Sequence, residues 1–286
     1  MNTQIEKISF EVPEHACDCH HHIIEDVIRY PVDPQSKVVL EDEPVDKYIA
    51  LKKKLGIERD VVVSIAAYGY DNSNTLAALK KLGKKTTRAI ITLNDRVTDQ
   101  QLDEYQELGV RGIRIWNRFP FSFRYLEALA PRLAERGWHA CLFPVSAEDI
   151  VDWEPLLQKL PIPVVFDHMG NIPAEAGENH PAFRVIGDLL YEGKGWVKIS
   201  GVQIGDVPPD FERKVALSRK FIQINPEHIL WGSDWPHMGN RVPDAPRCAD
   251  VEDTHLFNLL AEQALDEKIR HRILVENPEK LYGFGE

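Results

Sequence analysis

The stretch ACDCHHHII, residues 16–24, places one aspartate and three consecutive histidines within five positions. Side chains alternate between the two faces of a β-strand, so a strand here would place Asp18, His20 and His22 on one face. The two cysteines and His21 would lie on the other face, where small thiols pack as modest hydrophobes. The alternative is a polar turn that happens to be rich in histidine. The rest of the chain has to decide between the two.

Seven further runs of strand-forming residues follow, separated by amphipathic segments with helical periodicity. With residues 16–22 they give eight strand candidates, the others being residues 60–68, 87–94, 112–117, 138–145, 163–170, 196–202 and 228–236. Several of the helical segments end at a glycine, which readily adopts the left-handed C-terminal cap. Eight strands alternating with helices in 286 residues predict a (β/α)₈ TIM barrel, as a single domain over residues 1–286.

An open, doubly wound α/β sheet is the alternative fold. That fold usually binds phosphate at a glycine-rich turn after an early strand. No G-x-G-x-x-G or G-x-x-x-x-G-K-[ST] pattern follows any early strand of this chain. We therefore expect the barrel.

Composition and charge argue against several classes of partner. There are 34 Lys and Arg against 45 Asp and Glu, a formal net charge of −11, which disfavours nucleic-acid and anionic-membrane partners. No apolar run approaches the roughly 20 residues that span a bilayer, and the N-terminus lacks the pattern of a signal peptide. We therefore expect a cytoplasmic protein. The four cysteines are too scattered for a disulfide framework and are expected to be reduced, and the oligomeric state stays open.

The C-terminal ends of the predicted strands carry polar side chains. Catalytic groups of TIM barrels project from these ends, which closure of the barrel brings to one rim. The polar residues there are His20 and His22 at the first strand, Arg114 and Asn117 at the fourth, Asp167 and His168 at the sixth, and Ser233, Asp234 and His237 at the eighth. Because the first and eighth strands are neighbours, we expect His20, His22, His168 and Asp234 to form one catalytic site.

This set of residues suits two kinds of chemistry. Three imidazoles and a carboxylate could hold one divalent ion, zinc or manganese rather than magnesium, and leave a place for a water whose pKa falls to about 7. Without a metal, the imidazoles could polarise a carbonyl while Asp234 takes a proton from water. Cationic or metal-bound neighbours should keep Asp234 ionised near neutral pH. No Lys or Glu ends the fourth strand, and the fifth ends in Phe143 and Pro144, so at most one metal is expected.

Four motifs together resemble one family. They are D-x-H-x-H at residues 18–22, F-D-H-M-G at 166–170, W-G-S-D-W-P-H at 231–237 and V-E-N-P-E-K-L-Y at 275–282. From residue 16 to residue 282 the chain resembles the amidohydrolase superfamily, specifically the amidohydrolase-2 group, whose lactonases act on pyrone dicarboxylate, sulfomuconolactone and sugar lactones. The resemblance implies a lactone hydrolase with Asp234 as general base and His20, His22 and His168 around the scissile carbonyl. Since some members of the group bind a metal and others do not, it leaves that choice open.

Two departures from the family pattern bear on the substrate. In the pyrone dicarboxylate lactonases an arginine follows D-H-M-G, where this chain has Asn171, and another follows the seventh strand, where KISGVQIGD carries none. Those arginines would clamp carboxylates with two parallel hydrogen bonds, so their loss argues against the pyrone dicarboxylate itself. Arg114 and Arg118 remain, and they predict a substrate with one anionic group.

The other candidate substrate contacts are Tyr30, Asn117, Asn171 and His237. Arg114 could instead pair with an acidic residue inside the barrel. Asn117 and Arg118, on the loop after the fourth predicted strand, could be solvated surface residues. His237 could orient a neighbour rather than touch the substrate. Tyr30 lies on the long first loop, which would be a lid or wall of the site. Asp18, deeper in its strand, is expected to hold a histidine tautomer.

Three alternatives to lactone hydrolysis stay open. A metal-dependent, non-oxidative decarboxylase would share the D-x-H-x-H start, although V-E-N-P and the N-terminal half favour the lactonase. A lactone isomerase would use the same carbonyl activation, with a substrate hydroxyl in place of water. A catalytically silent barrel is disfavoured, because a buried carboxylate facing imidazoles costs desolvation energy.

Overall fold

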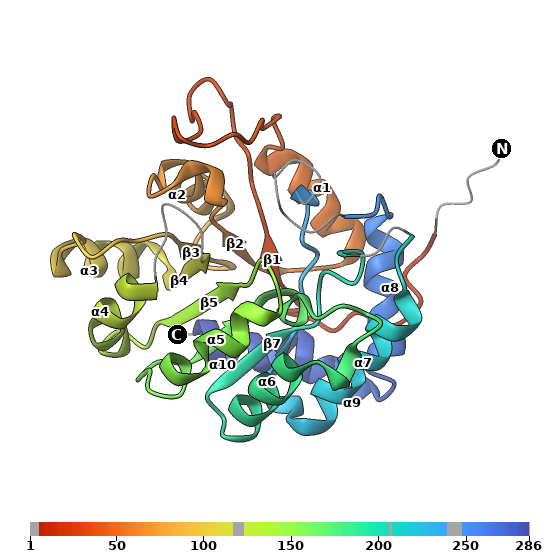
Figure 1. Ribbon diagram of the computed structural model, residues 1–286. Coiled ribbons are helices and arrows are strands. Elements are labelled where there is room, and N and C mark those ends of the chain that lie inside the picture. The colour runs from red at the N-terminus through yellow and green to blue at the C-terminus, as the bar shows by residue number, and fades with distance from the viewer. Residues whose placement is uncertain (1–5, 117–122, 206–207, 239–247, 286) are drawn as a thin grey trace.

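Eight parallel β-strands form a nearly closed barrel surrounded by helices in the computed structural model of the chain (Figure 1). The structure describes residues 6–116, 123–205, 208–238 and 248–285. The strands are β1 (Cys17–His21), β2 (Arg59–Val63), β3 (Thr87–Ile91), β4 (Val110–Trp116), β5 (His139–Phe143), β6 (Val164–Phe166), β7 (Gly195–Lys198) and β8 (Ile229–Leu230). They pair in sequence order from β1 to β8, which confirms the predicted TIM barrel.

Helices α1 to α7 lie between successive strands, helices α8 to α10 follow β8, and together they cover the outside of the barrel (Figure 1). They are α1 (Val45–Leu55), α2 (Ser73–Leu82), α3 (Asp99–Leu108), α4 (Phe123–Ala134), α5 (Glu148–Leu157), α6 (Pro181–Tyr191), α7 (Phe211–Ile224), α8 (Asp253–Gln263), α9 (Glu267–His271) and α10 (Asn277–Tyr282). α6 shows how sequence sets such a helix: the His180 side chain caps its first turn, Pro181 occupies the first helical position, and Val185 and Leu189 are buried on one face. Within the described residues, no helix has the length and apolar character needed to cross a membrane.

The barrel closes between β1 and the residues that follow the short β8. The backbone amide of Asp234 donates to the carbonyl of His20 at 2.8 Å, and that of His22 donates to the carbonyl of Trp235 at 2.8 Å. These bonds continue the parallel pairing beyond β8 and lay its extension along the end of β1. As a result, Asp234 stands beside the two histidines although their positions in the sequence are far apart.

Two apolar layers hold the barrel together. The inner layer fills the barrel with alternate residues of the strands, namely Cys17, Cys19, Val61, Val63, Ile90, Cys141, Val165, Trp196 and Leu230. The outer layer packs the opposite faces of the strands against the helices. All four cysteines are buried and unbridged, as expected.

The C-terminal segment closes the end of the barrel where the strands begin. Tyr282 and Phe284 pack onto the inner layer. Arg88, near the start of β3, donates from Nε to the carbonyl of Tyr282 at 3.1 Å and from Nη2 to that of Gly283 at 2.6 Å, and its guanidinium carbon lies 4.6 Å from the centre of the Phe284 ring. Among the described residues, this end of the barrel is therefore covered by the C-terminal segment and Arg88.

The expected alternation along β1 is wrong near its end. The register between β1 and β2 shifts between Asp18 and His21, so these two residues share the helix-facing side. Asp18 accepts hydrogen bonds from the Tyr48 hydroxyl at 3.0 Å and from the Ser233 amide at 2.9 Å, and the His21 ring stacks on Tyr48. Asp18 therefore does not hold a histidine ring, and the extra residue of the bulge turns His20 toward the barrel interior.

Candidate active site

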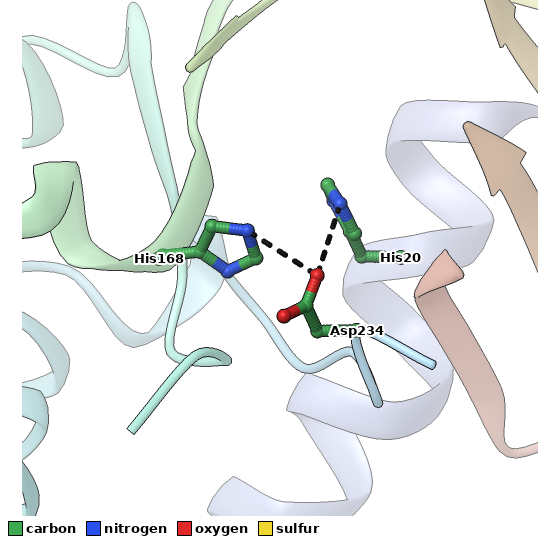
Figure 2. Close-up of side chains that lie close together, drawn as sticks. All are labelled: His20, His168 and Asp234. Atoms are coloured by element: carbon green, nitrogen blue, oxygen red, sulfur yellow. Dashed lines mark ion pairs between the residues drawn. The ribbon is translucent and has the colours of Figure 1, made fainter. Parts of the chain in front are cut away.

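The structure brings His20, His22, His168 and Asp234 together where the strands end. Oδ1 of Asp234 lies 3.5 Å from Nε2 of His168, 3.7 Å from Nε2 of His20 and 4.0 Å from Nε2 of His22. In Figure 2 the rings of His20 and His168 both point at this oxygen. All four side chains are buried. The site therefore focuses three imidazole nitrogens on one carboxylate oxygen.

Unusual backbone conformations place two of these residues. His168 and Asp234 have φ values of 50° and 60°, in the left-handed region that residues other than glycine seldom adopt. Such strain persists only where the surroundings enforce it, and it concentrates at functional sites. Gly201 packs against the His168 ring, where an added Cβ would lie 2.6 Å from Nδ1. Glycine there leaves the space that the imidazole occupies.

Each imidazole is anchored through Nδ1, which leaves Nε2 directed at Asp234. Nδ1 of His22 donates to the backbone carbonyl of Val63 at 2.8 Å, because a carbonyl can only accept. Nδ1 of His168 lies 3.1 Å from the Ser200 hydroxyl. These outer contacts fix the ring orientations, as partners of metal-binding or catalytic histidines commonly do.

The anchor of His20 was missed by the sequence reasoning. Nδ1 of His20 lies 2.9 Å from Nζ of Lys198 and 3.1 Å from Oδ1 of Asp167, and Nζ lies 3.0 Å from that oxygen. Lysine is almost never fully buried unless it is paired. A lysine on the inward face of an apolar strand, two residues after Trp196, was the available signal.

The charges inside the site follow from burial. Burial lowers the pKa of all three imidazoles, with a further contribution from the charge of Lys198 at His20 and of Arg114 at His22. Burial raises the pKa of Asp234, although the charges of His168 and His237 oppose the shift. Burial therefore favours the neutral form of these three imidazoles near pH 7, whereas the pKa of His237, which also acts on Asp234, is raised. That the neighbours of Asp234 are cationic or metal-bound stays a prediction.

The described side chains fit a divalent metal ion. Ligand atoms of His20, His168 and Asp234 lie within 4.8 Å of one another, and Nε2 of His20 is buried without a hydrogen-bond partner among the described residues. Zinc bonds of 2.0–2.1 Å in a tetrahedron place ligand atoms about 3.3 Å apart, close to the separations found here. His22 lies slightly farther out and outside this set. The residues present are thus a candidate metal site.

Arg114 is buried inside the barrel and has partners there. Nη1 donates to the carbonyl of Ser64 at 2.9 Å, and Nη2 lies 3.5 Å from Oδ2 of Asp167. Arg114 thus pairs with an acidic residue inside the barrel, Asp167, as the alternative interpretation of the sequence expected. Asn171 has a φ of 50° and donates from Nδ2 to the carbonyl of Pro144 at 2.6 Å.

His237 is held beside Asp234 by contacts at both ring nitrogens. Nδ1 lies 3.0 Å from Nε2 of Gln203, and Nε2 lies 3.0 Å from Oδ1 of Asp253. The Gln203 amide also lies 3.4 Å from Oδ2 of Asp234. Although burial opposes it, the hydrogen bond and charge of Asp253 raise the pKa of His237. These contacts match an orienting role.

The remaining predicted contacts are one residue that the structure describes and two that it does not. Tyr30 packs with Ile24, Ile65 and Met238 in a cluster formed by the long first loop. That position suits a wall of the site. Asn117 and Arg118 lie outside the described residues.

A TIM barrel with histidines and an aspartate at these strand ends is the arrangement of an amidohydrolase. The model of the family described as Amidohydrolase matches residues 17–284, and the chain belongs to that family. The 4-sulfomuconolactone hydrolase of Rhizobium radiobacter is 32% identical over 292 residues, covering 96% of this chain and 92% of the relative. The D-galactarolactone isomerase of Agrobacterium fabrum is 30% identical over 241 residues, covering 83% and 80%.

A solved structure of an Agrobacterium tumefaciens protein shares the fold. It has a TM-score of 0.80 and 27% identity, and the match covers 95% of this chain and 96% of that one. The predicted family is thereby confirmed over nearly the whole chain.

Proposed function

We propose that the protein hydrolyses the ring ester of a small lactone that carries an anionic group, with Asp234 as general base. The observation that carries the proposal is the focus of three buried imidazole nitrogens on one oxygen of Asp234. The curated relatives named above, one a lactone hydrolase and one a lactone isomerase, support a lactone as the substrate class.

The reaction needs one proton acceptor and a group that stabilises negative charge on the carbonyl oxygen. Asp234 accepts a proton from water as the water oxygen attacks the carbonyl carbon, and the carbonyl oxygen gains charge. When the ring C–O bond breaks, the protonated Asp234 returns its proton to the leaving oxygen, which gives a hydroxy acid. Burial of Asp234 raises its pKa and makes it a stronger base than an exposed aspartate.

The three histidines surround the place where the carbonyl oxygen would lie. A ring whose Nε2 carries hydrogen can donate to that oxygen, whereas a ring whose Nε2 carries a lone pair can hold a cation. His20 and His168, with Asp234, would hold a zinc or manganese ion, with His22 as a fourth residue close by. Such an ion would polarise the carbonyl and lower the pKa of a nearby water.

The anionic group on the substrate is proposed from Arg114 and Arg118. Arg114 is engaged with Asp167, so it acts on a substrate anion through its charge, and Arg118 is proposed as the direct contact. Asn171, where the pyrone dicarboxylate lactonases have an arginine, narrows the proposal to a substrate with fewer carboxylates. We also propose a cytoplasmic location and no nucleic-acid partner, the latter because the formal net charge is −11.

An oxygen-isotope experiment separates the candidate reactions. A panel of anionic lactones is incubated with the protein in H₂¹⁸O, and products are followed by mass spectrometry. Hydrolysis adds the mass of one labelled water, because the attacking oxygen stays in the product carboxylate. Isomerisation, the second candidate because of the 30% identical isomerase, leaves the mass unchanged, and decarboxylation releases CO₂. If the panel yields only isomers or CO₂, or no turnover, the hydrolase proposal is wrong.

A further inference from the structure

Three buried polar atoms meet in a triangle below the site. They are Nδ1 of His20, Nζ of Lys198 and Oδ1 of Asp167, and their separations are 2.9, 3.0 and 3.1 Å. The three side chains are fully buried. The Asp167 carboxylate thus faces two positive charges, Lys198 at Oδ1 and Arg114 at Oδ2. The network is thus a fixed structure rather than a surface ion pair.

The ammonium of Lys198 occupies a place that a second metal would need. His20, Asp167 and Cys141 form a second set whose ligand atoms lie within 4.8 Å of one another. Nζ of Lys198 lies close to all three, with 3.3 Å to Sγ of Cys141. The protein's own cation therefore fills this set, and Nδ1 of His20 is left for hydrogen bonding.

Nδ1 of His20 faces a donor and an acceptor at once. An ammonium group can only donate, an ionised carboxylate can only accept, and a neutral imidazole carries one N–H. If Nδ1 carries the hydrogen, it donates to Asp167 and leaves a lone pair on Nε2. If Nδ1 is bare, it accepts from Lys198, and Nε2–H points at the site. Both tautomers thus find a partner without any movement of the ring.

We propose that Lys198 and Asp167 are positioning residues that let His20 take either tautomer, according to what faces its Nε2. With a divalent cation there, Nδ1 donates to Asp167. Without a cation, Nδ1 accepts from Lys198, and Nε2–H is available to the carbonyl oxygen. The imidazole keeps one hydrogen in both states, so its charge does not change. The role of that hydrogen in lactone opening rests on the proposed function, whereas the tautomers themselves do not.

His22 supplies an internal contrast. Its Nδ1 faces only the carbonyl of Val63, at 2.8 Å, which accepts and cannot donate. The neutral His22 ring is therefore held with hydrogen on Nδ1, whatever lies at Nε2. The two histidines of one strand end should thus behave differently.

Nuclear magnetic resonance of ¹⁵N-histidine-labelled full-length protein tests the proposal. Two-bond ¹H–¹⁵N correlations distinguish the tautomers. Variants in which one histidine at a time is replaced assign each signal to its residue. In chelator-treated protein we expect Nε2–H at His20 and Nδ1–H at His22. After addition of Zn²⁺ we expect Nδ1–H at both. Nδ1–H at His20 in the metal-free protein, or no change at His20 when Zn²⁺ binds, would overturn the proposal.

Substitutions at Lys198 identify the donor. Lys198→Met removes it, and His20 should then show Nδ1–H with and without Zn²⁺; Lys198→Gln restores a donor, and Nε2–H should return in the metal-free form. Lys214→Met removes another buried lysine, which donates to the carbonyl of Ile172 at 2.7 Å, and should leave the His20 tautomer unchanged. An unchanged Nε2–H in Lys198→Met would contradict the proposal.

If Lys198→Met does not fold, two measurements still test the proposal: the His20 tautomer of the wild-type protein with and without Zn²⁺, and that of Lys198→Gln. Loss of Nε2–H in the metal-free Gln variant would count against the proposal. A failure to turn over lactones would refute the proposed function and leave the tautomer result standing. If the protein hydrolyses lactones but His20 keeps one tautomer with and without Zn²⁺, the tautomer proposal is refuted and the proposed function stands.

Discussion

Oδ1 of Asp234 lies 3.5 Å from Nε2 of His168, although the two residues follow β8 and β6, which are not neighbouring strands. Both side chains are buried, so their interaction is little screened by water. A small carbonyl compound that contacts both side chains would meet a base and an imidazole together. This relationship is the basis of the first prediction.

Asp234→Asn should lower turnover while substrate binding changes much less. The substitution keeps the shape of the side chain and removes its basicity. We expect kcat to fall by about 10² to 10⁴, the usual range for acid–base catalysis, with a far smaller change in KM. Steady-state kinetics on a lactone that the parent hydrolyses provide the measurement. Near-normal turnover in the variant would show that another group is the base.

His20→Ala should change both kinetic parameters and, where a metal is bound, metal content. It removes one nitrogen of the set that includes His168 and Asp234 and leaves Lys198 and Asp167 without their shared partner. We expect KM to rise as kcat falls, together with a loss of bound zinc or manganese measured by elemental analysis of protein purified without chelator. A metal content of zero in the parent, with activity that survives chelation, would instead assign the histidines to hydrogen bonding with the carbonyl oxygen.

The sequence was sufficient to predict the barrel because its signal is repeated. Eight strand-like runs, each followed by a helical segment, agree with one architecture, and strand ends must share a rim once the barrel closes. That argument brought His168 and Asp234 to His20 without any contact being known. The grouping of these residues therefore follows from topology alone.

The local details were not available from the sequence. A period of two predicts faces only while the register is regular, and the bulge between Asp18 and His21 breaks it. The sequence predicts that Lys198 lies in a strand but does not predict its ion pair. The partner carboxylate, Asp167, comes from another strand, so the pair depends on how the strands are arranged. The sign of the pKa shift at Asp234 depends on burial, which a list of neighbouring residues does not contain.

Gly201→Ala should impair catalysis more than its effect on stability suggests. A Cβ at Gly201 would lie 2.6 Å from Nδ1 and 2.7 Å from Cβ of His168, so that ring must move. We expect kcat/KM to fall at least tenfold, because small displacements of catalytic groups are costly. Gly205→Ala is the matched control: its φ is also positive, at 104°, but apart from its chain neighbours no atom of the described residues lies within 4 Å of the added Cβ. The positive φ should cost each variant about 1 kcal/mol of unfolding free energy, and the overlap with His168 should cost Gly201→Ala about 1–3 kcal/mol more. Equal kcat/KM values would contradict the prediction.

Phe284→Ala should destabilise the fold and leave the chemistry intact. Phe284 is buried, packs on the inner layer and lies against the guanidinium of Arg88, at the end of the barrel opposite the site. Loss of a buried aromatic ring costs about 3–5 kcal/mol of unfolding free energy. Tyr191→Ala, at a side chain that is 83% exposed, should change stability by about 0.5 kcal/mol or less. Denaturant titration measures both values, and a similar loss in the two variants would argue against a sealing role of the C-terminal segment.

The stability of the protein should fall in acid, and His139 should account for part of the loss. His139 is fully buried, and neither ring nitrogen has a hydrogen-bond partner among the described residues. Burial and the charge of Lys198 lower its pKa to about 3, against about 6.5 in an unfolded chain. Between these two values the unfolded chain binds a proton that the folded protein does not, so the free energy of unfolding falls as pH falls, by about 1.4 kcal/mol per pH unit. Above pH 6.5 the histidine is neutral in both states and contributes no slope.

The variant His139→Leu removes this proton and keeps an apolar side chain of similar size. Relative to the parent, it should therefore gain about 2 kcal/mol of unfolding free energy when the pH is lowered from 7.5 to 5.0, because about 1.5 pH units of that interval lie below 6.5. Urea unfolding of chelator-treated protein at both pH values measures the difference, and chelation removes the pH dependence that a bound metal would add. Comparing the change between the two pH values cancels the packing effect of the substitution, which is the same at each. Parallel pH dependences for parent and variant would mean that His139 gains a proton in the folded protein as readily as in the unfolded chain.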